Sequence, residues 1–214
     1  MTIRLLALDW NGCLLDDTRF NYRAVCAIVE RYNGTPPTFS HYQDHFGADM
    51  QYLSYYIEHG VPESLSDEDI KQMRFEYFMT HRNELRLAAE ATKVLAYCRE
   101  REIFCAIVSA EMPGLLIPIL HESGLASYFL SVTAGSYHKE TTVRALIEGY
   151  KIPVSQTLFV DDMPEEIVGV KKLGVRTAGF LGGHASERRV LSAEPDHTVH
   201  NFGDILSRIA TLEK

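Results

Sequence analysis

The 214-residue sequence lacks a surplus of positive charge, with 21 Lys and Arg against 29 Asp and Glu and a formal net charge of −8. It has no basic stripe of the kind that neutralises a phosphate backbone, so we expect no nucleic-acid partner. An acidic surface also repels small anions at long range. A site for an anionic ligand would therefore need local positive charge from a metal ion, a lysine or backbone N–H groups.

Paired cysteines and long apolar runs are also missing. The four cysteines, Cys13, Cys26, Cys98 and Cys105, are dispersed and form no C-x-x-C pair. Dispersed cysteines of this kind fit a reducing compartment, so we expect a cytoplasmic protein. The first apolar run, residues 3–8, is too short for a signal peptide or a membrane span, and we expect no membrane partner.

What the sequence does contain is typical of a globular protein, with 46% hydrophobic and 23% charged residues. Short apolar runs alternate with segments of helical periodicity. We predict strands at residues 3–8, 103–108, 129–133, 158–160, 175–180 and 197–200, and helices at residues 90–101, 114–123, 139–149 and 165–173. This alternation indicates an α/β protein with a parallel sheet that has helices on both faces.

One stretch interrupts the alternation, because residues 40–86 show helical signals only. We predict helices at residues 22–32, 50–59 and 67–84, the last of which begins after Ser66, a typical N-cap residue. The simplest interpretation is a helical cap domain at residues 17–87, inserted into a core domain formed by residues 1–16 and 88–214. The cap would cover the carboxyl edge of the sheet, where open α/β sheets bind ligands.

Polar residues follow several of the predicted strands. They are Asp9, Ser109, Lys139, Asp161 and Asp162. In a parallel sheet these strand ends converge on one edge, which would bring carboxylates, a hydroxyl and an ammonium together. Carboxylates bind Mg²⁺, and a lysine with a metal ion neutralises the charge of a transferring phosphoryl group.

The same segments resemble motifs of a known family. Residues 5–14, LLALDWNGCL, are similar to the first motif of the haloacid dehalogenase-like hydrolases, an apolar strand followed by D-x-D-G-T-L. The strand that ends at Ser109, the position of Lys139, and residues 159–167, FVDDMPEEI, resemble the second, third and fourth motifs. Gly47 resembles the cap loop of the helical-cap branch, which includes phosphoglycolate and phosphosugar phosphatases. This resemblance implies a three-layer Rossmann-like core with an inserted α-helical cap.

The resemblance also implies an activity, that of a phosphatase acting on a small phosphorylated metabolite. Asp9 would be the nucleophile that forms an aspartyl-phosphate. Ser109 would bind phosphoryl oxygens, and Lys139 would pair with Asp9 and the phosphate. Further contacts to the substrate or its phosphate would come from Trp10, Gly12, Gly47 and Ala110.

A Mg²⁺ cofactor follows from the same resemblance. Asp9 and Asp162 would hold the ion with their carboxylates, and Asn11 with its backbone carbonyl. Asp161 or Glu166 would support the ion through water.

Asn11 departs from the family pattern, which has Asp at this position. The family carboxylate protonates the leaving alkoxide and later activates water, and a carboxamide can do neither. General acid–base catalysis contributes roughly 10²–10⁴-fold, so we expect a slow enzyme and a gain of activity in an Asn11→Asp variant. Three explanations stay open: an engineered residue, a substrate with a good leaving group such as an acyl or enol phosphate, or a protein that binds phosphate without turnover.

Other functions are compatible with part of the pattern. Dehalogenases of the family share the nucleophile but need no metal, whereas the acids around Asp162 favour one. Phosphonate hydrolases of the family need a cap lysine, for which Lys71 is the one candidate. His41 and His45 have the spacing of a helical metal pair, but no third ligand is apparent, so we expect them to be solvated cap residues.

Overall fold

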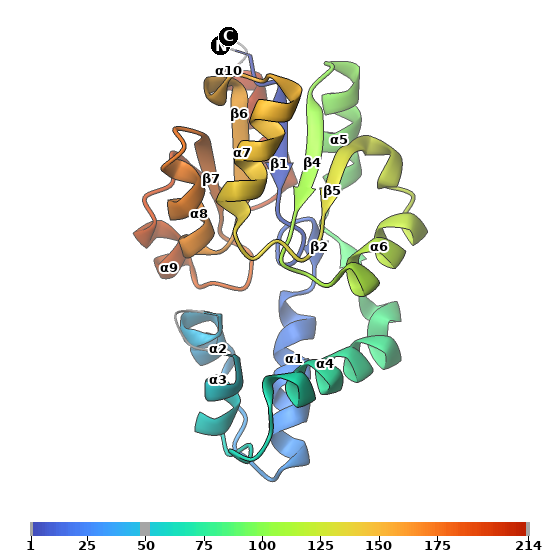
Figure 1. Cartoon of the computed structure of the whole chain (residues 1–214), viewed down its shortest axis with the longest axis vertical. Coiled ribbons are helices and arrows are strands. Elements are labelled where there is room, and N and C mark those ends of the chain that lie inside the picture. The colour runs from blue at the N-terminus through green and yellow to red at the C-terminus, as the bar shows by residue number, and fades with distance from the viewer. Residues whose placement is uncertain (1, 48–51, 213–214) are drawn as a thin grey trace.

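The computed structural model describes residues 2–47 and 52–212 of the chain. Within these residues, six parallel strands form one sheet in the order β5-β4-β1-β6-β7-β8 (Figure 1). They are β1 (Leu5–Leu8), β4 (Phe104–Val108), β5 (Phe129–Thr133), β6 (Thr157–Asp161), β7 (Arg176–Phe180) and β8 (His197–Val199). Leu5 of β1 is aligned with Phe104 of β4 on one side and Thr157 of β6 on the other. The predicted α/β fold is confirmed.

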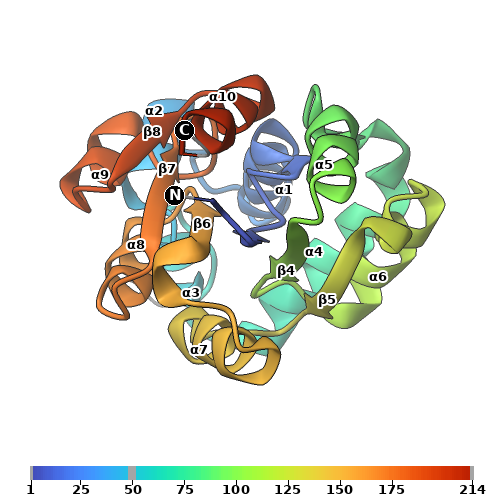
Figure 2. The same ribbon diagram turned by 90° about the horizontal axis from the view of Figure 1, so that it is seen from above.

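Helices cover both faces of the sheet. They are α5 (Ala91–Glu100), α6 (Pro113–Glu122), α7 (Lys139–Tyr150), α8 (Pro164–Lys171), α9 (Glu187–Ser192) and α10 (Phe202–Leu212). Leu6 and Leu8 of β1 pack in one core cluster with α5 and α10, whereas Leu5 and Ala7 pack in another with α7 and α8. This division follows from the alternation of side chains along a strand. The view from above shows the two helical layers on opposite sides of the strands (Figure 2).

The remaining helices form a helical segment beyond the carboxyl edge of the sheet (Figure 1). They are α1 (Thr18–Arg31), α2 (Phe39–His45), α3 (Tyr52–Glu58) and α4 (Asp67–His81). Their apolar side chains form a separate cluster, which includes the buried Tyr42, Tyr55 and Tyr56. A short antiparallel pair, β2 (Leu15–Asp16) and β3 (Arg86–Leu87), brings the two ends of the helical segment side by side.

Most predicted elements are confirmed, with ends that move by a few residues. The helix predicted at residues 50–59 is α3 in the described part, and Met50 lies outside the described residues. The sequence pattern predicted neither α2, α9 and α10 nor the strands β2 and β3. Two-residue strands show no periodicity, because they form only by pairing with each other. No helix within residues 2–47 and 52–212 is long and apolar enough to cross a membrane.

Candidate active site

Asp9 follows β1 directly and is only 4% exposed. The ammonium of Lys139, the first residue of α7, donates hydrogen bonds to Asp9 Oδ1 and to Asp161 Oδ2, each at 2.7 Å. Burial opposes the charge of Lys139, but the carboxylates of Asp161 and Asp9 favour it more strongly and raise its pKa well above the ordinary value. Three of the predicted residues, from three elements, therefore form one buried ion-pair network.

Asp162, which follows β6, is fully buried. Its Oδ2 accepts a hydrogen bond from the backbone N–H of His184, whereas Oδ1 accepts none from the described residues. Burial raises the pKa of Asp162 to about 6. A bound cation would oppose this shift and would give the unpaired oxygen a partner.

The donor atoms around Asp162 match a hard cation. In the described part of the chain, Asp9, Cys13 and Asp162 each place a ligand atom within 4.8 Å of the other two. Mg²⁺ takes oxygen ligands, commonly one or two carboxylates together with waters and phosphate oxygens, so the two carboxylates fit it. Cys13 does not fit, because burial raises the pKa of its thiol well above the ordinary value and keeps it neutral.

Two glycines make room for the Asp162 carboxylate. Gly12 has a positive φ of 70°, and a Cβ there would lie 2.5 Å from Asp162 Oδ2 and 2.6 Å from the His184 ring. A Cβ at Gly183 would lie only 2.1 Å from the same carboxylate oxygen. The loop after β1 and the loop after β7 thus close around Asp162, and a side chain at either glycine would displace it.

Asn11 has a defined role in this loop. Its amide nitrogen donates to Asp17 Oδ2 at 2.6 Å and to Glu111 Oε2 at 3.1 Å. The other oxygen of Asp17 accepts the Gly12 backbone N–H at 2.7 Å. The carboxamide therefore contributes its two N–H donors to two carboxylates. An aspartate in its place would add a third carboxylate with no proton to donate.

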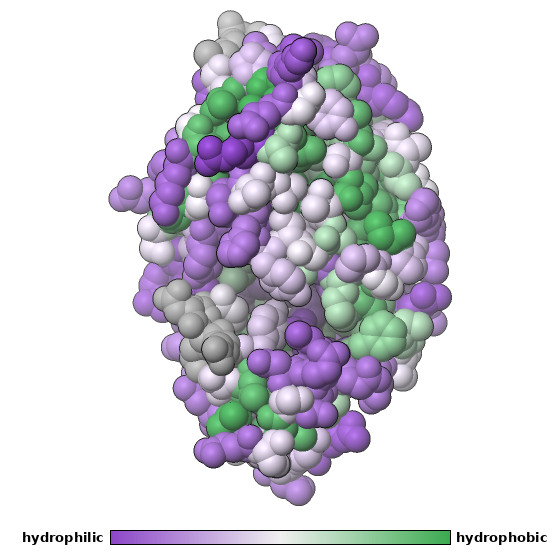
Figure 3. Space-filling view, viewed as in Figure 1, coloured by the Kyte–Doolittle hydropathy of each residue, from purple (hydrophilic) through white to green (hydrophobic). Residues whose placement is uncertain are grey.

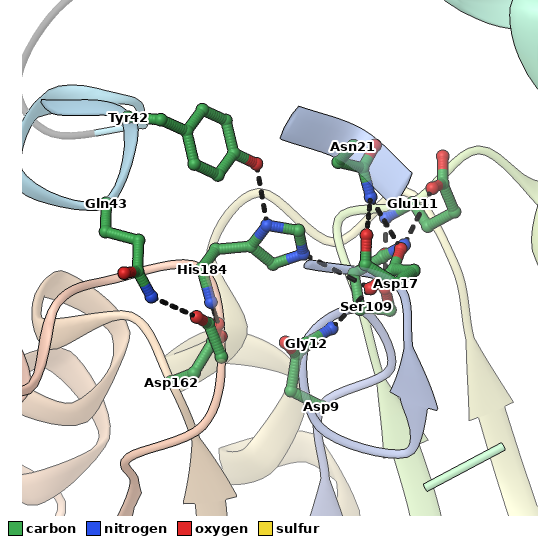
Figure 4. Close-up of polar contacts among 12 residues, drawn as sticks. Asp9, Gly12, Asp17, Asn21, Tyr42, Gln43, Ser109, Glu111, Asp162 and His184 are labelled. Atoms are coloured by element: carbon green, nitrogen blue, oxygen red, sulfur yellow. Dashed lines mark hydrogen bonds and ion pairs between the residues drawn. The ribbon is translucent and has the colours of Figure 1, made fainter. Parts of the chain in front are cut away.

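His184 connects the loop of residues 9–14 after β1, here called the Asp9 loop, with the helical segment. Its Nε2 lies 3.3 Å from Asp17 Oδ1, and its Nδ1 lies 2.8 Å from the hydroxyl of Tyr42 on α2 (Figure 4). Burial alone would lower the pKa of His184, but the carboxylate of Asp17 outweighs burial and raises it. The amide of Asn21 on α1 also donates to Asp17, at 2.7 Å.

Ser109 lies where it was predicted, at the end of β4, and is buried. Its hydroxyl accepts the backbone N–H of Glu111 at 3.0 Å, and its own N–H donates to Thr133 on β5. Ala110 follows and is partly exposed. Figure 4 draws Ser109 in the same close-up as Asp9 and Asp17.

The other predicted site residues have more varied surroundings. Trp10 is fully buried, with its indole in the sheet core, and its carbonyl accepts the Leu15 N–H at 2.7 Å. Gly47 adopts a φ of 70° and approaches Met163, next to Asp162. Asp161 accepts from Lys139 and from the Met163 N–H at 2.8 Å, so both of its oxygens have protein partners. Burial raises the pKa of Glu166, and the nearby Lys139 acts in the opposite direction.

Sequence reasoning missed Asp17, Asn21, Glu111, Tyr42 and Arg74 as residues of this region. Two of them had a local signal: Asp17 stands three residues after the first motif segment, and Glu111 stands two residues after Ser109. The others come from the helical segment, whose approach to the sheet edge shows no sequence periodicity.

Known proteins resemble the chain over nearly its whole length. A family model described as haloacid dehalogenase-like hydrolase matches residues 7–180. The phosphoglycolate phosphatase of Vibrio parahaemolyticus serotype O3:K6 is 21% identical over 223 residues, which cover 97% of this chain and 96% of that protein. The phosphoglycolate phosphatase of Vibrio vulnificus strain CMCP6 is 24% identical, with 95% of each chain covered.

Solved structures share the fold at low identity. A haloacid dehalogenase-like protein of unknown function from Agrobacterium tumefaciens superposes with a TM-score of 0.82 at 18% identity, covering 99% of this chain and 100% of that one. A predicted phosphoglycolate phosphatase from Haemophilus somnus gives 0.76 at 16% identity, covering 97% and 98%. The chain therefore belongs to the haloacid dehalogenase-like hydrolase family, and its curated relatives are phosphatases.

Proposed function

We propose that the chain is a Mg²⁺-dependent phosphatase that hydrolyses a small phosphorylated metabolite through an aspartyl-phosphate on Asp9. The observation that carries this proposal is the buried contact of Asp9 with Lys139, beside an Asp162 oxygen that has no partner among the described residues. The names of the curated relatives support a phosphatase and make 2-phosphoglycolate the first substrate to test.

Asp9, Asp162 and the backbone carbonyl of Asn11 would hold Mg²⁺. The ion would supply positive charge against the oxygens of the transferring phosphoryl group. Asp161 is better placed to orient Lys139, because its two oxygens already accept hydrogen bonds. Glu166 remains the candidate for support through water, as the resemblance implied.

The chain's own residues suggest the order of bond changes. An Asp9 oxygen attacks phosphorus, the bond from phosphorus to the leaving oxygen breaks, and the electron pair goes to that oxygen. Lys139 holds Asp9 Oδ1 through a hydrogen bond of 2.7 Å, and Ser109 would bind a phosphoryl oxygen. Water then attacks phosphorus, the bond from phosphorus to Asp9 breaks, and its electron pair restores the carboxylate. The proton that water loses balances the one that the leaving oxygen takes up from solvent. Asn11 offers no acid for the leaving oxygen, so substrates with good leaving groups should react fastest.

We further propose that residues 17–87 act as a cap domain over a core of residues 1–16 and 88–214. The paired strands β2 and β3 at the junction and the separate apolar cluster support this division. The space-filling view shows a hollow on one face between the sheet core and the helical segment (Figure 3). A closed cap would exclude water from the Asp9 loop during the chemistry.

The test is phosphate release from a panel of phosphate esters, acyl phosphates and 2-phosphoglycolate, with Mg²⁺ and with EDTA. We expect hydrolysis that requires Mg²⁺ and that falls by at least about 10³-fold in Asp9→Asn, since the nucleophile is lost. Lys172→Gln, a charge change at the exposed residue that follows α8, is the matched control and should change little.

Asn11 also favours a second candidate, a protein that binds phosphate without turnover. Binding of orthophosphate in the presence of Mg²⁺, together with no hydrolysis across the panel and none after restoring an acid at position 11, would support this candidate over the phosphatase.

A further inference from the structure

A cavity of about 370 Å³ lies where the helical segment joins the sheet core. Its walls come from the paired strands β2 and β3, from the turn η1 (Arg82–Glu84) that follows α4, and from the end of α6. Figure 1 shows α6 next to the end of α4, where Arg82 contacts Glu122. We call this cavity the ribbon pocket and define it by Leu15, Arg82, Arg86, Leu87, Ile119 and Glu122.

Aliphatic side chains form the apolar part of the ribbon pocket. Leu15 is 1% and Leu85 is 9% exposed, and both belong to the large core cluster. Leu87 and Ile119 are partly buried and pack against the same cluster. An apolar body that settles on these four side chains loses its contact with water, which is the main driving force for binding in cavities of this kind.

The polar part of the pocket holds two guanidiniums and one carboxylate. Arg82 Nη2 lies 3.3 Å from Glu122 Oε1. Arg86 Nη1 donates to the backbone carbonyls of Asn83 and Leu85 at 2.5 and 2.7 Å, which holds this guanidinium at the pocket wall. The pocket therefore has a net positive charge.

Arg86 presents a fork of donors that the rest of the described chain does not use. Both of its contacts are made by Nη1, and its Nε and Nη2 donate to no atom of residues 2–47 and 52–212. The N–H groups on Nε and Nη2 are parallel and lie in the plane of the guanidinium. Two parallel donors of this kind match the two oxygens of a carboxylate.

Glu122 limits the charge of the anion that the pocket can hold. It is the last residue of α6, and the final carbonyls of a helix carry a partial negative charge. A phosphate group with a charge of about −1.5 to −2 would be repelled more strongly by Glu122 and by the helix end than a carboxylate with a single charge.

We propose that the ribbon pocket binds a small carboxylic acid with an apolar body. The carboxylate would lie on the Nε and Nη2 donors of Arg86, and the apolar body would lie on Leu15, Leu87 and Ile119. No step of the proposed phosphatase reaction uses this pocket, so the inference stands whether or not the chain hydrolyses phosphate esters. Because the ligand would contact both α6 and the end of the helical segment, its binding favours the arrangement of the two segments described here.

Leu15 connects the ribbon pocket with the Asp9 loop. Its N–H donates to the Trp10 carbonyl at 2.7 Å, and its carbonyl accepts the Asp17 N–H at 3.0 Å. Openings that dismantle the pocket must first release the ligand. At a ligand concentration ten times Kd, hydrogen exchange of the Leu15 and Asp17 amides should therefore slow by about tenfold.

The binding test uses three probes of one shape, 3-phenylpropanoate, 3-phenylpropanamide and 3-phenylpropylamine, each titrated into the full ¹⁵N-labelled chain and followed by NMR. The acid should bind roughly fivefold more tightly than the amide, the upper range for an ion pair that is open to solvent. The amine, which meets two guanidiniums, should bind most weakly. The shifted amide signals should centre on Leu15, Leu87 and Ile119.

Two variants with opposite expected effects test the charges. Arg86→Gln should remove the preference for the acid and leave the affinity for the amide within about twofold. Glu122→Gln should strengthen binding of the acid by about twofold or more, because it removes a repelling charge and frees Arg82. Arg144→Gln, at an exposed position of α7, is the matched control and should leave all three affinities unchanged.

Four results would overturn the inference, and two of them need no variant. Equal affinity of the unchanged protein for acid and amide would remove the role of Arg86, and tightest binding of the amine would assign the pocket to a cation. Signals that shift around Gly12 and Ser109 instead of Ile119 would place the probe in the active site. Absence of a saturable shift with all three probes would exclude the pocket as a binding site.

Discussion

At the scale of single residues, Asn11 is the most informative position. Its amide donates hydrogen bonds to the carboxylates of Asp17 and Glu111. Asn11 is therefore fitted to its two partners, and its replacement would affect both of them. Sequence alone led us to expect that Asn11→Asp would gain activity. The structure changes this expectation, because the new carboxylate would face two others, and mutual repulsion raises the pKa of such groups.

We predict that Asn11→Asp alone gains little in kcat on alkyl phosphates. The double variant Asn11→Asp with Asp17→Asn should have a kcat at least about tenfold above that of the single variant. In the double variant residue 17 carries the amide donor and residue 11 the carboxylate acceptor, so one of the two repulsions on the new carboxylate is removed. Steady-state kinetics at saturating Mg²⁺ would measure both. A full gain in the single variant would contradict this account.

Gly183 allows a second prediction at the residue scale. A Cβ there would lie 2.1 Å from Asp162 Oδ2, so Gly183→Ala should displace that carboxylate and weaken Mg²⁺ binding by at least about tenfold. Calorimetric titration with Mg²⁺ measures the affinity. Gly149→Ala is the control: nothing lies within 4 Å of its Cβ position in α7, and it should stabilise the protein by about 0.5–1 kcal/mol. Equal Mg²⁺ affinity in both variants would exclude the steric role of Gly183.

The site residues that the sequence predicted correctly share one local feature. Asp9, Ser109 and Asp162 each follow an apolar strand, and strand ends in a parallel sheet meet at one edge, so periodicity alone brings them together. Asp17 and His184 meet only because two loops close over Asp162. Such loop closure depends on the packing of the whole chain, which no local pattern encodes.

At the scale of elements, the start of α4 was predictable because its signal is local. Ser66 Oγ accepts the Asp69 N–H at 3.2 Å, and Asp69 accepts the Ser66 N–H at 2.8 Å, a complete capping box. We predict that Ser66→Ala lowers the free energy of unfolding by about 1 kcal/mol. Urea denaturation measures it, with the exposed Ser64→Ala as control. A similar loss in both variants would argue against the capping role.

α2 was not predicted as a separate helix, and its histidines have a partner that sequence reasoning did not find. The ring centroids of His41 and His45 lie 4.2 Å apart, and that of His59 lies 5.1 Å from His41. The sequence showed no third ligand for this pair, and the fold brings His59 beside His41. In the described residues, however, their ring nitrogens do not come close enough together to form a metal-binding group.

This histidine cluster predicts a pH dependence. Burial, followed by the charges of His45 and His59, lowers the pKa of His41 below 6.5, although Glu58 and Asp44 act in the opposite direction. Between the lowered pKa and 6.5 the unfolded chain binds a proton that the folded chain does not. Stability should therefore rise with pH across this window.

Urea midpoints measured on both sides of pH 6.5 would test this dependence. His41→Gln should flatten the slope, whereas His121→Gln, on α6 outside the cluster, should leave it unchanged. An equal slope in the original protein and in His41→Gln would refute the assignment.

At the scale of the whole molecule, the helical segment contacts the core through α2 and the loop after β7. The Ser186 hydroxyl donates to Asp44 at 2.6 Å, and the Ser186 N–H donates to the Gln43 carbonyl at 2.9 Å. The architecture of two layers around a parallel sheet was predictable from alternating patterns. The contacts of Ser186 with Asp44 and Gln43 were not predictable, because polar residues of this kind show no pattern in the sequence that pairs one with another.

We predict that Asp44 and Ser186 are energetically coupled. A double-mutant cycle of Asp44→Asn and Ser186→Ala should give a coupling of about 0.5–1.5 kcal/mol in the free energy of unfolding. Ser186 and Arg188 lower the pKa of Asp44 below 3.8, so the carboxylate's contribution is present above pH 3.8 and is lost as the pH falls through the lower folded-state value. Additive effects of the two changes at neutral pH would contradict the coupling; Ser207→Ala, on α10, supplies an additive reference.

The ribbon of β2 and β3 has a consequence for the history of such proteins. Because Leu15 is aligned with Leu87 and Asp16 with Arg86, the chain departs from the sheet and returns to it at neighbouring points. The segment between β2 and β3 can therefore be replaced as a unit during evolution without shifting the strands that carry Asp9 and Asp162. Bond-breaking machinery and ligand choice can then diverge at separate rates, and a chimera with a foreign insert at this ribbon should keep the first while exchanging the second.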